Sequence, residues 1–460
     1  MKSIKTVMCI SLAVLLLFLS ACVDTSQPAE VIEVEDLTES PKSAPVTQNE
    51  ELSGGQPSQP VEITFMHCFG GLHAEIFNDF ADEFNELNYG KYIVEMTPVD
   101  GSYEGVLERT QILNLSNNLP DIVNGGHHFL HFMVNNFPYV PVQTFIDREG
   151  YDTSDIFPGM LDLGRDPSGE LAALVFGVST PVIIYNDDLF KANGITSPPR
   201  TFDEVREVAK KITDDEHYGI YINIEQPGLW IIQSLIENYG EQMLSADSRG
   251  VGFNQAGIEA FSFINNVINV DESMPLPMSD STGGGFQGAV EMFRAGNIGM
   301  IISSTGQLSN LQKDATHTVL SAPFPTMDGS YFSIPGGGNS NIILTQDPAK
   351  QDAAWEFLKY LSLPENATKV SQGFGYMVIS QTAFNTPDMM GDFLSENPAF
   401  RSTYDQVPYM SLWLNFPGNS GTRYVSITQD NIAAMIQGEK TPEQAAADTI
   451  EQLNAIIAQG

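Results

Sequence analysis

The stretch that decides the fold is Ser179-Thr180-Pro181-Val182-Ile183-Ile184-Tyr185-Asn186-Asp187-Asp188-Leu189-Phe190-Lys191-Ala192-Asn193-Gly194-Ile195. Its β-branched run, Val182 to Ile184, predicts a buried strand. The polar residues Asn186 to Asp188 follow directly and can cap the free N–H groups at the start of a short helix, which Gly194 ends. A buried strand that leads straight into a helix is typical of an α/β protein.

The chain continues this alternation on both sides of the stretch. After Pro198-Pro199, Thr201 and Glu204 form a capping box that opens another helix. We expect strands at 61–67, 92–96, 120–124, 298–302 and 342–344, and helices at 74–87, 103–114, 230–239, 255–270, 286–295, 349–361, 430–436 and 442–458. Strands that alternate with helices predict an α/β fold with mainly parallel sheets flanked by helices.

Four segments resemble, in the same order, the bacterial extracellular solute-binding proteins of family 1, and most closely their glycerol-3-phosphate-binding and maltose-binding-like subgroup. The first is residues 179–204, and the second is the helix, glycine and strand of 286–304. The third is the amphipathic helix with the residues that follow it, 353–367, and the fourth is 438–445, which is similar to the C-terminal signature of the family. The resemblance covers nearly all of residues 61–460.

The resemblance implies a two-lobe periplasmic-binding-protein fold. Each lobe is then a mainly parallel sheet flanked by helices, and the ligand cleft lies at the hinge. We expect lobe 1 to comprise residues 61–180 and 304–365, and lobe 2 to comprise residues 181–303 and 366–460. Both lobes are discontinuous because the chain of such proteins crosses the hinge more than once.

The N-terminus has the features of a bacterial lipoprotein signal. Lys2 and Lys5 precede the apolar run 14–18, which is too short for the roughly 20 residues that a membrane span needs. Leu19-Ser20-Ala21-Cys22 matches a lipobox, so residues 1–22 are expected to form a signal that ends at Cys22, which would carry lipid such as palmitate. An ordinary secretory signal that contains a cysteine is the alternative. Residues 23–60, rich in Pro, Ser, Gln, Thr and Glu, are expected to form a disordered polar tether.

The composition is strongly acidic, with 58 Asp and Glu against 21 Lys and Arg and a formal net charge of −37. Loss of two lysines and no acidic residue with the signal makes the charge −39. Such a surface repels nucleic acid, so no nucleic-acid partner is expected. Cys9 would be removed with the signal and Cys22 would carry lipid, so Cys68 would be the remaining free cysteine. A single cysteine can form neither an intramolecular disulfide nor a cysteine-based zinc cluster.

Polar residues that follow the predicted strands are candidates for ligand binding, because ligands of such folds bind at the carboxyl ends of strands. These candidates are His67, Asn124, Ser179, Thr180, Ser303 and Ser304. The glycine-rich segment 336–340 adds Gly337, Gly338 and Asn339. There we expect the backbone to approach a ligand closely, because glycine has no side chain.

The resemblance adds aromatic and cationic candidates, which are Tyr103, Trp230, Tyr376 and Arg423. The aromatic three match ligand-contacting positions of the subgroup, and the arginine resembles its phosphate contact. His127 stands where the subgroup has an acidic contact, so recognition is expected to differ there. Trp413 is expected to line the cleft, whereas Trp355 lies on the apolar face of its helix and is expected in the core.

These features predict the substrate-capturing lipoprotein of an ATP-driven ABC importer. The resemblance implies a monomer, held by lipid on the extracytoplasmic side of the cell membrane, that delivers its ligand to the permease subunits. The ligand is expected to be a carbohydrate or a phosphorylated polyol such as glycerol 3-phosphate, and the acidic charge favours an uncharged saccharide. Neither a cofactor nor catalysis is expected.

Two alternatives remain at this point. His127, His128 and His131 could form part of a metal-binding receptor, because the first and last of them lie on one face of a helix. A secreted glycoside hydrolase is less favoured. Two carboxylates could flank a glycosidic bond, but the chain has no nucleophile elbow, no P-loop and no spaced carboxylate motif.

Overall fold

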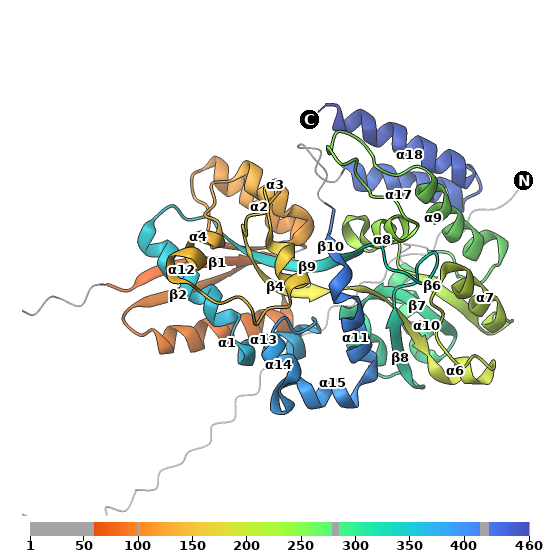
Figure 1. The fold of residues 1–460 in the computed structure, drawn as a ribbon, viewed down its shortest axis with the longest axis horizontal. Helices are drawn as coiled ribbons and strands as arrows, with labels where there is room; N and C mark the ends of the chain where they lie inside the picture. Colours follow the sequence, from red (N-terminus) through yellow and green to blue (C-terminus); the bar gives the residue numbers. More distant parts are fainter. Residues whose placement is uncertain (1–58, 100–101, 278–284, 415–422, 460) are drawn as a thin grey trace, which may run out of the picture. The chain divides into compact units, whose positions relative to one another are not determined.

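The computed structural model describes residues 59–99, 102–277, 285–414 and 423–459 (Figure 1). The expected signal 1–22, its Cys22 and nearly all of the tether 23–60 lie outside the described residues. The description below concerns the compact unit 56–460 alone. No helix within the described ranges is long and apolar enough to cross a membrane.

The first sheet has the strand order β10-β9-β3-β1-β2, with β4 paired to β9 as a branch. Its strands are β1 (Val61–His67), β2 (Tyr92–Pro98), β3 (Ile122–Gly126), β4 (Leu174–Ser179), β9 (Ile334–Ile343) and β10 (Met410–Leu412). The pairs β1–β2, β1–β3 and β10–β9 are parallel, while β3–β9 and β4–β9 are antiparallel.

The second sheet has the order β6-β7-β5-β8. Its strands are β5 (Pro181–Asn186), β6 (Tyr218–Ile222), β7 (Ile298–Ser304) and β8 (Val319–Pro323). Only the β6–β7 pair is parallel. Strand β5 is buried along its whole length, as its β-branched run predicted.

The α/β class with helices flanking two sheets is therefore confirmed, but the sheets are mixed rather than mainly parallel. The antiparallel pairs involve the strands at which the chain passes from one sheet to the other. A parallel pair of consecutive strands needs a long crossover, usually through a helix. The passages between the sheets have no such helix: Thr180 alone separates β4 from β5, and a loop joins β8 to β9.

The expected lobe boundaries also change. Strand β8, which we expected in lobe 1, pairs in the second sheet. Helix α13 (Pro364–Phe374), most of which we expected in lobe 2, buries Ala367, Val370 and Phe374 in the core of the first sheet. Within the described part of the last expected segment, α17 (Arg423–Ile436) and α18 (Pro442–Ile457) pack with the second core, as do Ala399, Trp413 and Leu414. The apolar side chains of each helix decide which sheet it covers.

Helices α1 (Gly71–Leu87), α4 (Val142–Glu149) and α12 (Pro348–Leu361) surround the first sheet, and α7 (Phe202–Ile212), α9 (Gln255–Asn265) and α10 (Gly285–Ala295) surround the second (Figure 1). The other helices are α2 (Tyr103–Leu115), α3 (Leu130–Asn136), α5 (Pro158–Leu161), α6 (Asp187–Ala192), α8 (Trp230–Asn238), α11 (Leu308–Gln312), α14 (Gln381–Asn385), α15 (Asp392–Glu396) and α16 (Pro398–Arg401). A π-helical segment, Asn266–Val270, continues α9, and α17 begins earlier than the expected residue 430.

Local signals in the sequence account for several helix starts. The Asn186 side chain accepts a hydrogen bond from the Leu189 N–H at 2.9 Å and so caps α6. Thr201 and Glu204 form the predicted capping box of α7. Trp355 lies in the core with no exposed surface, as predicted, and its ring stacks on Phe145 at a centroid distance of 5.6 Å.

The glycine-rich segment 336–340 is part of strand β9. Strand β9 pairs on one side with β3 and on the other with β4, so its backbone hydrogen bonds go to neighbouring strands. Gly338 has a φ of +114°, and a Cβ atom there would lie 2.0 Å from the Gly177 carbonyl oxygen. The glycines are required by contacts within the protein.

Candidate ligand-binding site

Three asparagine side chains meet where β3 pairs with β9. The Asn124 amide donates hydrogen bonds to Asn339 Oδ1 at 2.8 Å and to Asn341 Oδ1 at 2.7 Å. The antiparallel register that aligns Asn124 with Asn341 brings them together. All three are buried, and Asn124 Oδ1 has no hydrogen-bond partner in the part of the chain that the structure describes. This acceptor is free for a further donor.

Two tyrosines extend this network. Asn339 Nδ2 donates to the Tyr103 hydroxyl at 2.9 Å and to the Tyr376 hydroxyl at 3.2 Å, and the two hydroxyl oxygens are 2.9 Å apart. Tyr103 begins α2, and Tyr376 follows Gly375, whose φ of +73° ends α13. Burial raises the pKa of Tyr376 to about 12 and that of Tyr103 above its usual range, so both hydroxyls stay protonated.

His67 lies at the end of β1 with its ring stacked on Phe77, at a centroid distance of 4.6 Å. The backbone N–H of Phe69 donates to His67 Nδ1 at 3.2 Å. Burial lowers the pKa of His67 to about 4, so the ring is neutral at pH 7 and its proton is on Nε2. That donor has no hydrogen-bond partner within the described ranges.

The three histidines of the alternative metal site contact different groups. His127 Nδ1 lies 3.2 Å from the Gly336 carbonyl oxygen, and His131 Nε2 lies 3.3 Å from the Arg165 carbonyl oxygen. The His128 ring instead contacts the Trp413 ring, tilted by 31° and with the centroids 3.9 Å apart. The described residues include no group of three or more His, Cys, Asp or Glu that could hold a metal ion. The geometry therefore gives no support to a metal receptor.

Trp230 and Trp413 come together with their ring centroids 5.9 Å apart. The Trp230 indole N–H donates to the Pro335 carbonyl at 2.8 Å, and that of Trp413 donates to the Gly228 carbonyl at 3.2 Å. A Cβ atom at Gly337 would lie 2.8 Å from the Trp230 ring. Both tryptophans are buried, and Gly337 and Gly228 leave space for them.

The predicted hydroxyl residues at the crossing between the sheets mostly bind protein groups. The Thr305 hydroxyl accepts from the Thr180 N–H at 3.1 Å, and the Thr180 hydroxyl accepts from Gln406 Nε2 at 3.1 Å. Ser303 Oγ accepts from Asn223 at 3.1 Å, and Ser304 Oγ accepts from the Gly306 N–H at 3.1 Å. These hydroxyls hold the crossing strands in place.

Two further predicted residues differ in their surroundings. Ser179 ends β4 beside Gly337, where an added Cβ atom would lie 2.8 Å from the Ser179 hydroxyl oxygen. Arg423 is exposed at the first residue of α17, directly after the undescribed residues 415–422. Within the part of the chain that the structure describes, no hydrogen bond or ion pair joins Arg423 to these asparagines and tyrosines.

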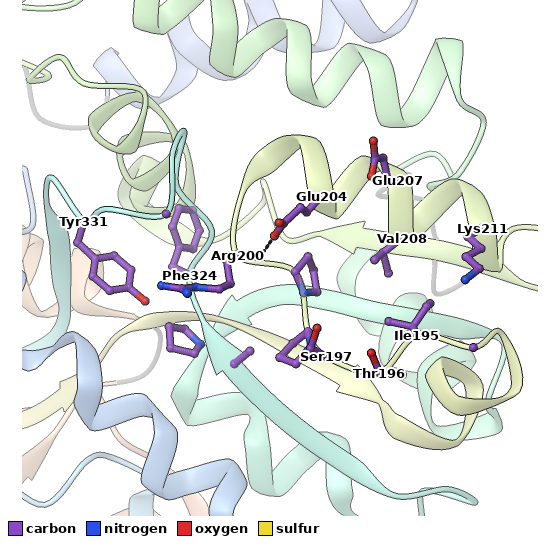
Figure 2. A pocket seen from close by; sticks show the side chains of 16 residues that line it. Ile195, Thr196, Ser197, Arg200, Glu204, Glu207, Val208, Lys211, Phe324 and Tyr331 are labelled. Carbon is purple, nitrogen blue, oxygen red and sulfur yellow. Dashed lines mark hydrogen bonds between the residues drawn. The ribbon is translucent and has the colours of Figure 1, made fainter.

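A separate cavity of about 580 Å³ lies beside the second sheet and contains none of the predicted ligand residues. Residues 194–200, helix α7, the end of β8 and Tyr331 line it. Figure 2 shows Tyr331 and Lys211 at opposite sides of it, with Arg200 next to Tyr331 and with Glu204 and Glu207 along the helix toward Lys211. The predicted ligand residues instead gather around β3, β9 and the two tryptophans.

The comparison with known families identifies the family of the chain that contains this cluster. The family model described as "Bacterial extracellular solute-binding protein" matches residues 70–368. The chain belongs to this family. Its members bind solutes and do not catalyse reactions, so the solute-binding protein is not an enzyme and the glycoside-hydrolase alternative is wrong.

Curated relatives and solved structures extend the similarity over most of the solute-binding protein. The sn-glycerol-3-phosphate-binding periplasmic protein UgpB of Brucella abortus is 24% identical over 429 residues, which cover 88% of this chain and 95% of the relative. The Escherichia coli protein of the same name is 25% identical over 428 residues, 88% of this chain and 94% of the relative.

Two solved structures share the fold. A cyclic alpha-maltosyl-1,6-maltose binding protein from Arthrobacter globiformis gives a TM-score of 0.73 at 19% identity, covering 87% of this chain and 100% of the other. UgpB from Mycobacterium tuberculosis, solved with glycerophosphocholine, gives 0.72 at 18% identity, covering 87% and 99%. The periplasmic-binding-protein architecture of the solute-binding protein is thus confirmed.

Sequence reasoning missed two polar residues that the structure places beside the predicted ones. Asn341 shares the β9 face of Gly337 and Asn339, and the period of two along a strand could have identified it. Glu104 follows Tyr103 in the first turn of α2, and its Oε1 lies 3.6 Å from His128 Nε2. No local signal in the sequence pairs these two residues.

Proposed function

We propose that this solute-binding protein is the substrate-capturing lipoprotein of an ABC importer and that it binds a carbohydrate. The observation that carries the proposal is the cluster around Asn339, which combines amide groups, two tyrosine hydroxyls and tryptophan faces. Within it, His67 Nε2 and Asn124 Oδ1 are buried without partners. An unsatisfied buried polar group costs about 1–3 kcal/mol, which the hydroxyl groups of a sugar would relieve.

The tryptophans suit the same class of ligand. The C–H face of a sugar ring is apolar, and an aromatic face binds it while hydroxyl groups at the ring edge find polar partners. Trp413 is held beside polar His128 and lies near Trp230, so apolar and polar surfaces are adjacent. Trp230 and Trp413 would contribute the aromatic face, and Asn124, Asn339, Tyr103 and Tyr376 the polar edge.

A phosphorylated polyol is the second candidate. It is supported by the curated relatives, whose names describe sn-glycerol-3-phosphate binding. In that case Arg423, at the start of α17, is the proposed phosphate contact. The solved structures with maltose or other sugars in their names support the carbohydrate reading instead.

Binding is proposed to act through the joint between the two sheets. Ser179, Thr180, Ser303 and Ser304 lie where β4 passes into β5 and where β7 ends. A ligand that contacts residues from both cores favours the arrangement in which those residues are close. We propose that this liganded form docks on the permease, that the protein acts as a monomer without a cofactor, and that lipid at Cys22 holds it to the membrane.

Replacing Asn339 with alanine should weaken ligand binding by about tenfold or more, because it removes the amide that joins both tyrosine hydroxyls to Asn124. A thermal-shift screen of sugars, polyols and their phosphates, followed by calorimetric titration, measures this. A ligand that binds only the folded state raises the melting temperature.

The matched control is Asn366→Ala. Asn366 is also a buried asparagine, but its amide donates to the Tyr360 carbonyl at 2.8 Å on the far side of the first core. That variant should melt earlier than the natural protein and keep the ligand-induced shift. If no sugar, polyol or phosphate shifts the melting of the natural protein, the proposed function is wrong.

A further inference from the structure

We propose that Glu104, acting with His128, determines the specificity of this site by binding a hydroxyl group of an uncharged saccharide and disfavouring phosphate-bearing ligands. The inference rests on the proposed function and names the ligand class for the same site. Neither residue was among the expected ligand contacts, and the structure brings the two side chains together beside the aromatic cluster.

Glu104 lies between the buried cluster and solvent. It is the second residue of α2, next to Tyr103, and 28% of its side chain is exposed, whereas the side chain of His128 is 1% exposed. The Ser102 hydroxyl donates to Glu104 Oε2. The other carboxylate oxygen, Oε1, faces His128 Nε2 across 3.6 Å. One carboxylate oxygen is thus held by the protein and the other faces the cluster.

His128 is packed tightly but lacks hydrogen bonds. Its ring contacts Trp413 at a centroid distance of 3.9 Å and meets Tyr103 edge-on at 6.2 Å. A Cβ atom at Gly126 would lie 2.8 Å from the His128 ring, so the ring cannot shift toward that backbone. Neither ring nitrogen has a hydrogen-bond partner among the described residues, since 3.6 Å exceeds hydrogen-bond length.

A ligand hydroxyl group is proposed to bridge these two side chains at hydrogen-bond distance from each, beside the 3.6 Å gap rather than within it. A hydroxyl has one hydrogen to donate and oxygen lone pairs to accept, so it can donate to Glu104 and accept from His128 at once. A phosphate oxygen can accept from His128, but an ionised phosphate group brings negative charge against the carboxylate. The pair therefore discriminates between the two chemical classes that the site could hold.

The protonation states support this discrimination. The His128 ring beside Glu104 and the hydrogen bond from Ser102 lower the pKa of Glu104 to about 2, so the carboxylate is ionised at pH 7. Burial lowers the pKa of His67 and His127 to about 4 and that of His128 below its usual range, so these rings are neutral. None of the imidazoles of the cluster offers a positive charge to a phosphate.

Among the described residues, no ion pair joins Glu104 to a lysine or an arginine. The charge of Glu104 interacts with Cys68 after β1, with Tyr424 on α17 and with His128. Residues 100–101 and 415–422, which adjoin the site in sequence, contain neither lysine nor arginine. Arg109 on α2 and Arg423 at the start of α17 are both exposed.

Calorimetric titration of the full-length protein tests the proposal with maltose, maltotriose and other uncharged saccharides against glycerol 3-phosphate and glycerophosphocholine. The natural protein should bind its best uncharged saccharide at least tenfold more tightly than either phosphate ligand. Glu104→Gln keeps the shape and removes the charge, so it should reduce that preference by about tenfold or more, because hydrogen bonds to charged groups are the stronger ones. A ratio of two affinities is not altered by a general loss of stability.

The matched control is Glu108→Gln. Glu108 lies one turn further along α2, is exposed, and gives the same change in net charge. Glu108→Gln should leave the preference for the saccharide unchanged. Glu104→Asp, which keeps the charge, should still bind the saccharide more tightly than the phosphate ligands. If glycerol 3-phosphate binds more tightly and Glu104→Gln leaves the ratio unchanged, the inference is wrong while solute binding stands. If neither class binds, the proposed function fails with it.

Discussion

Trp355 and Trp413 are both buried, but their contacts give them different roles. Trp355 lies on α12 between Phe145 and Tyr151, and its indole N–H donates to Glu149 at 3.0 Å. All of these partners belong to the first core or its surface. Trp413 instead contacts His128 and Trp230, so it connects the first sheet with the second core.

Replacing Trp355 with alanine should lower the free energy of unfolding by about 3–5 kcal/mol, because the large cavity left in the core cannot collapse fully. Urea unfolding measures this loss, and the dissociation constant of the ligand in the folded protein should stay unchanged. Trp355→Phe, which keeps most of the stacking on Phe145, should lose less stability. A large loss of affinity in Trp355→Ala would contradict the separation of core and site.

Trp230 cannot serve as a purely functional counterpart to Trp355. The sequence suggested that Trp230 lies at a ligand contact, and the structure places it beside the cluster with only 1% of its surface exposed. Its indole N–H binds Pro335, and its ring lies against Gly337. Truncation of Trp230 is therefore expected to destabilise the fold as well as to alter the site.

At the scale of elements, strand β9 shows what the sequence could and could not predict. Its apolar end, Ile342 and Ile343, was predicted as a strand from residue types alone. The glycine-rich half was not, because its partners β3 and β4 are far away in the sequence. Glycine in the middle of a strand leaves room for a neighbouring group, here the Trp230 ring.

The predicted site shows the same division. Tyr103, Tyr376, Asn124 and Asn339 were proposed separately from strand ends and resemblance, and the structure joins them in one network. The contact between Glu104 and His128 depends on how α2 packs against β3, which no local pattern reveals. Sequence therefore identified most members of the cluster but not their pairing.

Helix α8 is joined to both β9 and β10 by a buried network around Glu237. Ser333 Oγ donates to the Glu237 carboxylate at 2.5 Å, and Gln233 Nε2 donates to it at 3.1 Å. Ser333 also bonds to Ser411 at 2.6 Å, and Gln233 bonds to the Leu412 carbonyl at 3.0 Å. Burial raises the pKa of Glu237 to about 7, because its effect is larger than that of these hydrogen bonds, which lower the pKa.

This network makes stability depend on pH. The unfolded state releases the proton near pH 4.3 and the folded state near pH 7, so between these values the folded protein binds more protons. The contribution of Glu237 to stability should therefore fall as pH rises through this window, by at most about 1.4 kcal/mol per pH unit. His67 and His127, whose pKa values burial lowers to about 4, act in the opposite direction below about pH 6.5. The difference in free energy of unfolding between the natural protein and Glu237→Gln, measured by urea unfolding at pH 5 to 8, isolates the contribution of Glu237. A difference that does not change with pH would show that Glu237 makes no such contribution.

At the scale of the whole molecule, the two sheets share one continuous chain that passes between them without helical crossovers. Thr180 joins β4 to β5, and the loop after β8 leads into β9. Composition and hydrophobic periodicity predicted the elements of each sheet, but the assignment of β8 and α13 depended on which core their apolar side chains meet. Such long-range packing is absent from any local window of the sequence.

The position of the protein in the cell is expected to depend on a single cysteine that lies outside the described residues. Cys22 ends the lipobox-like Leu-Ser-Ala-Cys, and lipid attached there would anchor an otherwise strongly acidic chain. Cys22→Ala should therefore move the protein from the membrane fraction to the soluble extracytoplasmic fraction, as immunoblots of fractionated cells would show. Cys68→Ala is the matched control, because Cys68 lies at the end of β1 within the folded unit and should leave the anchor intact. Salt-resistant membrane association of the Cys22→Ala protein would mean that lipid at this residue is not what holds it.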